Sequence, residues 1–182
     1  MEKKINTFYL VLLALFSALV CVLTVFVQIP VGVGYVNFGD ALIFLASAVL
    51  GPLGGAIVGA LGSSLADLFS GWVIYAPFTV FIKGAEGFLC GLLYRGAFKK
   101  IKPFLRRLLS CLLAGLVVIF GYFFVDWILY GFSPALYNFI SGPIQVGVSV
   151  IIAIIVLPRI PDIFYHERMG DEHNNTDKGN NE

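Results

Sequence analysis

The sequence predicts an all-α integral membrane protein, with six transmembrane helices packed in one bundle and both termini in the cytoplasm. Of its 182 residues, 59% are apolar and 13% are charged, whereas a soluble domain is roughly 45–50% apolar and about 25% charged. A bilayer core about 30 Å thick takes about 20 helical residues per crossing, so this length accommodates six crossings with short links. A third observation, the placement of Lys and Arg, sets the orientation of the bundle.

The composition also excludes several classes of function. A net charge of +1 provides no basic surface for nucleic acid. Cys21, Cys90 and Cys111 lie in apolar runs without the spacing of metal ligands, and the sequence has no Gly-x-x-x-x-Gly-Lys-Ser/Thr phosphate loop. Both histidines, His166 and His173, lie in the polar tail, so a Ser-His pair cannot form within the membrane. We therefore expect no enzyme activity, no catalytic residue, no metal and no cofactor.

The first predicted span is the apolar run from Phe8 to Val27, which Lys3 and Lys4 precede. This run is too long for the apolar core of a signal peptide, and no small-residue cleavage site follows it in a polar context. We therefore interpret it as a transmembrane helix.

Gly, Pro and charged residues divide the remaining apolar sequence into five further helices. A Gly/Pro-rich link, Gln28 to Phe38, precedes the second helix. Residues 1–160 are expected to form one transmembrane domain, and residues 161–182 a polar tail with the composition of a disordered segment. The five further helices are predicted at Gly39–Leu50, Pro52–Phe69, Pro77–Tyr94, Arg106–Leu129 and Ala135–Leu157.

The basic residues orient the bundle, because Lys and Arg in short loops stay cytoplasmic. Eleven of the twelve lie in three segments: before the first helix, around the link between the fourth and fifth helices, and after the sixth. With six spans these segments fall on one side, and the links on the other side contain no Lys or Arg. Five or seven spans would break this agreement. We therefore predict a multi-pass protein of the cell membrane with both ends inside.

Five ionisable residues lie within the predicted spans: Asp40, Asp67, Lys83, Glu86 and Asp126. An ionised group near the bilayer centre costs roughly 2.5–3.5 kcal/mol, so five of them must face protein or water rather than lipid. In the predicted topology the three Asp lie at outer helix ends, and Lys83 lies about 9 Å below the outer end of its helix, with Glu86 one turn deeper. This convergence indicates an outward-facing polar pocket. The alternative is that Lys83 only neutralises Glu86 or an Asp in a structural ion pair.

Polar and aromatic side chains extend this predicted pocket onto the last two helices. Residues three or four apart share a helix face, and Asn138, Ser141 and Gln145 follow this spacing. Aromatic residues gather on the outer side; their rings either form an interfacial belt or stack on a planar ligand. The candidate substrate-binding residues from this reasoning are Asp40, Asp67, Tyr75, Lys83, Glu86, Asp126, Trp127, Asn138 and Gln145.

Small residues recur at intervals of four in the third helix, which allows close packing of neighbouring backbones. They are Gly51, Gly55, Gly59 and Ser63. In the first helix Ala14 and Ala18 have the same spacing, which on its own is weak evidence for anything beyond packing.

Short segments between residues 29 and 84 occur in the order and composition of a known family. They are Ile29-Pro30, Tyr35-Val36-Asn37-Phe38-Gly39-Asp40-Ala41, Leu50-Gly51-Pro52, Gly62-Ser63-Ser64-Leu65-Ala66-Asp67, Tyr75-Ala76-Pro77 and Ile82-Lys83-Gly84. The sequence resembles the substrate-binding S components of energy-coupling factor (ECF) vitamin transporters, in the riboflavin, pyridoxine and hydroxymethylpyrimidine branch, over roughly residues 5–157. The resemblance adds Asn37 to the candidate substrate-binding residues.

The resemblance also implies a mechanism and partners. A vitamin-sized ligand would bind near the outer surface, under a lid formed by the link from Gln28 to Gly39. Ala14 and Ala18 match the small residues with which the family docks on a membrane scaffold subunit, itself driven by two cytoplasmic ATPase subunits. The S component would then topple to open its site inward.

The identity of the ligand is less constrained. Asp40, Asp126 and Lys83 offer hydrogen bonds to a neutral heterocycle that carries both donors and acceptors, which favours pyridoxine or hydroxymethylpyrimidine over riboflavin, pantothenate, a queuosine precursor or biotin. The alternative function is a self-contained secondary transporter in which Asp67, Glu86 or Asp126 carries a proton. Such transporters often contain internal repeats, and residues 1–94 and 95–182 show no convincing one.

Overall fold

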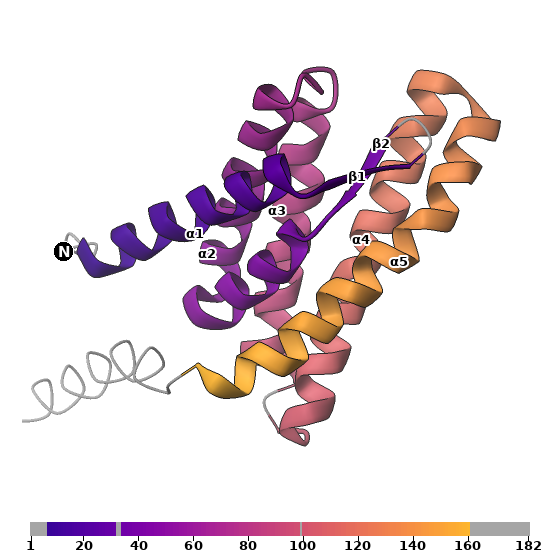
Figure 1. The fold of residues 1–182 in the computed structure, drawn as a ribbon. Helices are drawn as coiled ribbons and strands as arrows, with labels where there is room; N and C mark the ends of the chain where they lie inside the picture. The colour runs from indigo at the N-terminus through magenta and orange to yellow at the C-terminus, as the bar shows by residue number, and fades with distance from the viewer. Residues whose placement is uncertain (1–6, 32–33, 99, 161–182) are drawn as a thin grey trace, which may run out of the picture.

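The computed structural model describes residues 7–31, 34–98 and 100–160, with the backbone alone for the hairpin residues between 30 and 36. Its main elements are five helices and one β-hairpin (Figure 1). All five helices are long and apolar enough to cross a membrane. The predicted polar tail, residues 161–182, lies outside the described residues. The elements are α1 (Thr7–Phe26), β1 (Gln28–Val31), β2 (Gly34–Asn37), α2 (Gly39–Phe69), α3 (Ala76–Leu92), η1 (Leu93–Ala97), α4 (Pro103–Tyr130), α5 (Phe132–Val156) and η2 (Leu157–Arg159).

The all-helical class is confirmed, but the count of six helices is not. The two helices predicted at Gly39–Leu50 and Pro52–Phe69 form the single element α2, which is interrupted at Gly51 by a φ of 80° and a ψ of −172°. Glycine adopts this φ without strain, and Pro52 has no backbone N–H to continue the helix.

The two halves of α2 fold back on each other at this interruption. A straight helix would hold residues 43 and 59 about 24 Å apart, yet a Cβ added to Gly59 would lie 3.4 Å from Cγ2 of Ile43. Arg95 closes the turn: its Nε donates to the carbonyl oxygen of Ala48 at 2.9 Å, and its guanidinium also donates to that of Val49. One unbroken element therefore supplies two antiparallel segments.

The Gly/Pro-rich link between the first two helices contains a hairpin that the sequence did not predict. β1 pairs antiparallel with β2, and Gln28 lies opposite Asn37 at its base. The other helix boundaries differ from the predictions by a few residues. α4 begins at Pro103, where a proline costs no helical hydrogen bond, and Gly131, with a φ of 90°, separates α4 from α5.

The connections divide between two ends of the bundle. In Figure 1 the α2–α3 and α4–α5 connections lie at the top, and the α3–α4 connection and the end of α5 lie at the bottom. The described basic residues outside the bundle interior belong to the lower elements: Arg95, Lys100, Lys102, Arg106, Arg107 and Arg159. Two of the three predicted basic segments therefore share one end of the bundle in the described part of the chain, and the orientation in the membrane stays a prediction.

Glycines bring α2 and α3 into close contact. A Cβ added to Gly55 would meet the carbonyl oxygen of Gly87, one added to Gly59 would meet that of Lys83, and one added to Gly87 would collide with the backbone of Gly55. The hydroxyl of Ser47 donates to the carbonyl oxygen of Gly87 at 2.9 Å across the same contact. The small-residue spacing in the sequence thus corresponds to backbone packing between these helices.

Replacing Gly87 with Ala should therefore destabilise the protein. The added methyl would collide with backbone atoms, which cannot rotate away, and overpacking of this kind costs typically about 1–3 kcal/mol. Gly147→Ala is the matched control, because nothing lies within 4 Å of a Cβ at that position. Thermal unfolding in detergent should show a lower melting temperature for Gly87→Ala only, and equal melting of the two variants would contradict the packing described.

Candidate ligand-binding pocket

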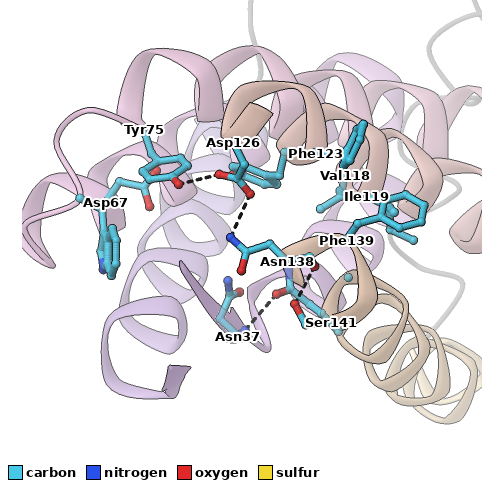
Figure 2. A pocket seen from close by; sticks show the side chains of 14 residues that line it. Asn37, Asp67, Tyr75, Val118, Ile119, Phe123, Asp126, Asn138, Phe139 and Ser141 are labelled. Atoms are coloured by element: carbon cyan, nitrogen blue, oxygen red, sulfur yellow. Dashed lines mark hydrogen bonds between the residues drawn. The ribbon is translucent and has the colours of Figure 1, made fainter. Parts of the chain in front are cut away.

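A pocket opens between the upper parts of α2, α4 and α5 and the link from α2 to α3, beside the last residue of β2 (Figure 2). It contains about 720 Å³ of space free of protein atoms, including the space at its mouth. Aromatic rings and polar groups share its wall. The lining residues are Asn37, Asp67, Trp72, Tyr75, Val118, Ile119, Tyr122, Phe123, Asp126, Asn138, Phe139, Ser141, Gly142 and Gln145.

Asp126 is the polar centre of one wall and is 3% exposed. The hydroxyl of Tyr75 donates to its Oδ1 at 2.6 Å, and Nδ2 of Asn138 donates to its Oδ2 at 3.0 Å. Both donors are neutral. Burial and then the hydrogen bond to Asp126 raise the pKa of Tyr75 above the ordinary value for a phenol, so this hydroxyl remains a donor at neutral pH.

The amide of Asn138 has one orientation that satisfies this contact. Only its nitrogen can donate to a carboxylate, so Oδ1 must face away from Asp126. This Oδ1 is buried and has no hydrogen-bond partner among the described residues. Figure 2 shows Asn138 between Asp126 and Asn37. The wall of the pocket therefore carries an acceptor that nothing described satisfies.

Tyrosine rings surround the same carboxylate. The ring of Tyr75 lies 6.3 Å, between centroids, from those of Tyr122 and Tyr130, and 6.0 Å from that of Trp72. Such spacing provides the flat apolar area that a planar ligand needs. Across the pocket, the hydroxyl of Thr79 donates to Asp67 and shares a 2.9 Å hydrogen bond with the hydroxyl of Tyr122.

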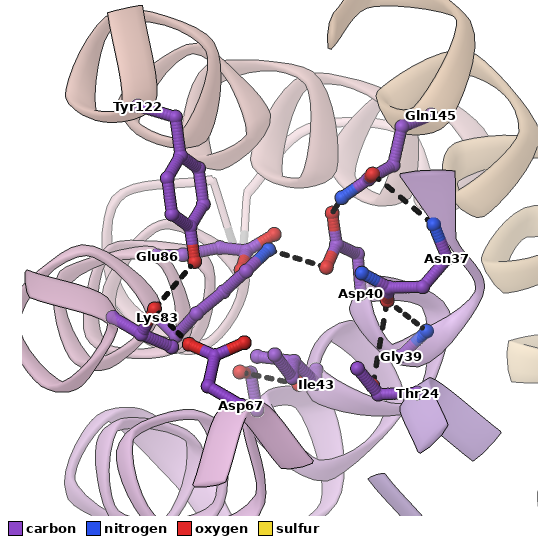
Figure 3. A network of polar contacts seen from close by, with 12 residues as sticks. Thr24, Asn37, Gly39, Asp40, Ile43, Asp67, Lys83, Glu86, Tyr122 and Gln145 are labelled. Atoms are coloured by element: carbon purple, nitrogen blue, oxygen red, sulfur yellow. Dashed lines mark hydrogen bonds and ion pairs between the residues drawn. The ribbon is translucent and has the colours of Figure 1, made fainter. Parts of the chain in front are cut away.

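Below the pocket lies a buried ion network of Asp40, Lys83 and Glu86 (Figure 3). Nζ of Lys83 donates to Asp40 and, at 3.1 Å, to Oε2 of Glu86. All three residues are at most 2% exposed, and none lines the pocket. The i,i+3 pair of Lys83 with Glu86 was expected from helical spacing, and Asp40 joins it from α2.

Gln145 connects the buried ion network to the pocket. Its Nε2 donates to Oδ2 of Asp40 at 2.8 Å, and its Oε1 accepts the backbone N–H of Asn37 at 3.2 Å. Asn37 in turn accepts the backbone N–H of Gly39 through its side-chain oxygen at 2.8 Å. One amide on α5 therefore fixes the base of the hairpin and one carboxylate of the network.

The structure separates the predicted substrate-binding residues into three groups. Three of them form the buried ion network. Trp127 is 47% exposed and packs on Phe123, Phe124 and Phe132 outside the pocket lining. The remaining six line the pocket together: Asn37, Asp67, Tyr75, Asp126, Asn138 and Gln145.

Sequence reasoning missed much of the apolar lining. Ile119 and Phe123 precede Asp126 on one helix face, and Phe139 and Gly142 lie among the polar positions of α5. The signal was present, because helical spacing from Asp126 identifies Ile119 and Phe123. Among the described residues no group of three or more His, Cys, Asp or Glu is placed to hold a metal ion.

The fold and the pocket define a class of protein: a multi-pass membrane protein with a polar and aromatic pocket among its helices at one end of the bundle. Comparison with known proteins specifies the family. The model of the ECF-type riboflavin transporter S component family matches residues 4–161, and the chain belongs to this family. The resemblance seen in the sequence is thereby confirmed, and this family is one of transporter components, not of enzymes.

Two curated relatives are similar over most of this chain. A protein of Pyrococcus woesei, described as an uncharacterized protein in gap 3′region, is 38% identical over 73% of this chain and 88% of its own length. The thiamine precursor transporter HmpT of Lactococcus lactis subsp. cremoris (strain MG1363) is 30% identical over 88% of this chain and 91% of its own length.

Proposed function

We propose that this protein is the substrate-binding component of an ECF-type importer in the cell membrane, and that it captures a small nitrogen heterocycle, a vitamin or vitamin precursor, from outside the cell. The observation that carries the proposal is the pocket, which lies at the end of the bundle opposite the basic residues and combines tyrosine rings with a buried carboxylate. A ligand of this kind uses flat area for affinity and polar groups for orientation.

The favoured ligand is a thiamine precursor of the hydroxymethylpyrimidine type. HmpT is named as a thiamine precursor transporter and is similar over nearly the whole chain. A small aminopyrimidine also fits the acceptors of Asp126 and Asn138. Riboflavin, which the family model names, and pyridoxine are the other ligands to test.

The β1–β2 hairpin is the proposed lid. Its base is held on two sides, by the 2.7 Å hydrogen bond from Nε2 of Gln28 to Oγ of Ser70 and by the contact of Asn37 with Gln145. These two contacts tie the hairpin to the α2–α3 link and to α5, and both must break for it to open.

Partners of two kinds follow from the proposal. A membrane scaffold subunit would dock on the exposed face of α1 that carries Ala14 and Ala18, and two cytoplasmic ATPase subunits would supply the energy. Both alanines are exposed, whereas Leu13, Ser17 and Val20 turn inward. In the proposed topology, with both termini inside, this face lies near the middle of α1. The reversal of α2 at Gly51 supports the count of six segments in this proposal.

Purified protein should bind one member of a vitamin panel with a Kd below about 1 µM. The panel comprises hydroxymethylpyrimidine, pyridoxine, riboflavin, pantothenate and biotin, and binding is read as a thermal shift and as retained ligand in native mass spectra. Ligand-free spectra and no shift with any compound would contradict the proposal.

A transport control separates this function from proton-coupled secondary transport. Vesicles that contain the protein alone should bind the panel ligand but not accumulate it under an imposed proton gradient. Accumulation without ATPase subunits would favour the secondary transporter.

A further inference from the structure

We propose that the pocket selects a planar nitrogen base in its protonated form, with Asp126 as the counter-ion, and that the edge it recognises is an amidine: a ring nitrogen next to a carbon that bears an amino group. The inference rests on the proposed function and names the chemical class of its ligand. It further means that binding takes up a proton from solution whenever the free ligand is neutral.

Unsatisfied acceptors are the first observation. An ionised carboxylate offers about four lone-pair sites, and Asp126 accepts only from Tyr75 and Asn138 among the described residues. Oδ1 of Asn138, in the same wall, has no partner. Each such acceptor that is left without a hydrogen bond in a closed site costs about 1–3 kcal/mol. A ligand that fills this end of the pocket must therefore donate hydrogen bonds rather than accept them.

The lack of a cation beside Asp126 in the described part of the chain is the second observation. The described buried residues include four acids and one base, Lys83, whose ammonium is bound to Asp40 and Glu86. No Lys, Arg or His is among the described residues that line the pocket. A carboxylate in a low-dielectric site gains most from a positive charge placed beside it.

The groups that face Asp126 from each side do not supply this charge. Tyr75 faces it from the start of α3, Tyr122 and Tyr130 share its helix, and α5 presents the neutral Asn138. From α2, Asp67 lines the same pocket and adds a second acid. The titratable neighbours are thus phenols and a carboxyl group, so a positive charge has to come with the ligand.

The shape of an amidinium matches these groups. It presents two N–H donors side by side, which pair with a carboxylate as the guanidinium of Arg does. Its flat positive ring also gains from the faces of Tyr75 and Tyr122. An analogue with a carbonyl in place of the amino group would instead direct an oxygen at the unsatisfied acceptors of Asp126 and Asn138.

Isothermal titration calorimetry of the purified protein tests the inference with two probes. They are amino-substituted hydroxymethylpyrimidine and its oxo analogue, in which a carbonyl replaces the amino group. The amino probe should bind at least about 100-fold more tightly. Titrations in buffers of different ionisation enthalpy should show uptake of about one proton per site when the pH is above the pKa of the free probe. Affinity should fall about tenfold per pH unit in that range, because only the protonated probe binds.

Two variants separate the charge from the hydrogen bonding. Asp126→Asn keeps the shape and removes the charge, so proton uptake should vanish and the preference for the amino probe should shrink by about tenfold or more. Tyr75→Phe removes a neutral donor from the same carboxylate, and proton uptake should persist. Unchanged proton uptake in Asp126→Asn would overturn the assignment of Asp126.

The outcomes for the inference and for the proposed function differ. Tight binding of any panel ligand without proton uptake, or of the oxo analogue in preference to the amino probe, overturns the inference and leaves the proposed function standing. Failure of every panel compound to bind overturns both.

Discussion

Replacing Lys83 with Met is expected to lower the free energy of unfolding by about 3–5 kcal/mol, because removal of one partner from a buried ion pair leaves an uncompensated charge. Lys83 is 2% exposed and its ammonium binds both Asp40 and Glu86. The variant would leave two fully buried carboxyl groups without their cation. Thermal and denaturant unfolding in detergent measure the loss, and a lower yield of folded protein should accompany it.

A triple variant serves as the control for this prediction. Lys83→Met combined with Asp40→Asn and Glu86→Gln removes all three charges together, and a neutral, similarly shaped replacement of a buried ion network is often nearly neutral in stability. The side chain of Gln145, which donates to Asp40 at 2.8 Å, retains an oxygen to bind. Most of the lost stability should therefore return. Wild-type melting of the single variant would show that the network does not hold the bundle together.

The sequence predicted the bundle well because long apolar runs have few alternatives in a membrane. The same physics located the pocket, since a polar group inside a span must turn toward protein or water. Asp126, Tyr75 and Asn138 were each identified separately, and the structure brings them into hydrogen-bond contact.

What the sequence could not predict depends on tertiary contacts. Helical spacing pairs Lys83 with Glu86, but no local rule indicates that Asp40, 43 residues away, completes the network. The hairpin was missed because its Gly and Pro content is typical of a loop. Trp127 was predicted as a substrate-binding residue, yet it is 47% exposed and outside the pocket lining, whereas Tyr122, four residues before Asp126, lines the pocket.

The reversal within α2 depends both on a local sequence signal and on a tertiary contact that this signal does not indicate. Gly51-Pro52 predicts a break between two helices, and the observed φ of 80° at Gly51 provides it. The stabilising contact comes from Arg95, in η1 directly after α3, which donates to the carbonyl oxygen of Ala48. A position predicted as part of a basic loop thus also closes a turn in another helix.

Replacing both Ala14 and Ala18 with Trp is expected to abolish uptake, to below about a tenth of the wild-type rate, while ligand binding stays intact. Both residues are exposed on α1 and neither lines the pocket. Large side chains there would hold the scaffold subunit away from a surface that small residues let approach closely. Uptake is measured in vesicles with the scaffold and both ATPase subunits, and binding by titration of the purified protein.

The matched control for this docking prediction is Leu15→Trp with Leu19→Trp, which changes the neighbouring exposed face of the same helix, where the side chains are 51% and 43% exposed. A Trp on a lipid-facing position replaces one apolar side chain with another, so uptake should remain near the wild-type rate. Loss of binding together with uptake in the Ala variant would mean that α1 is disturbed as a whole. Equal loss of uptake in both variants would show that docking does not depend on the small residues, and the scaffold surface would then have to lie elsewhere.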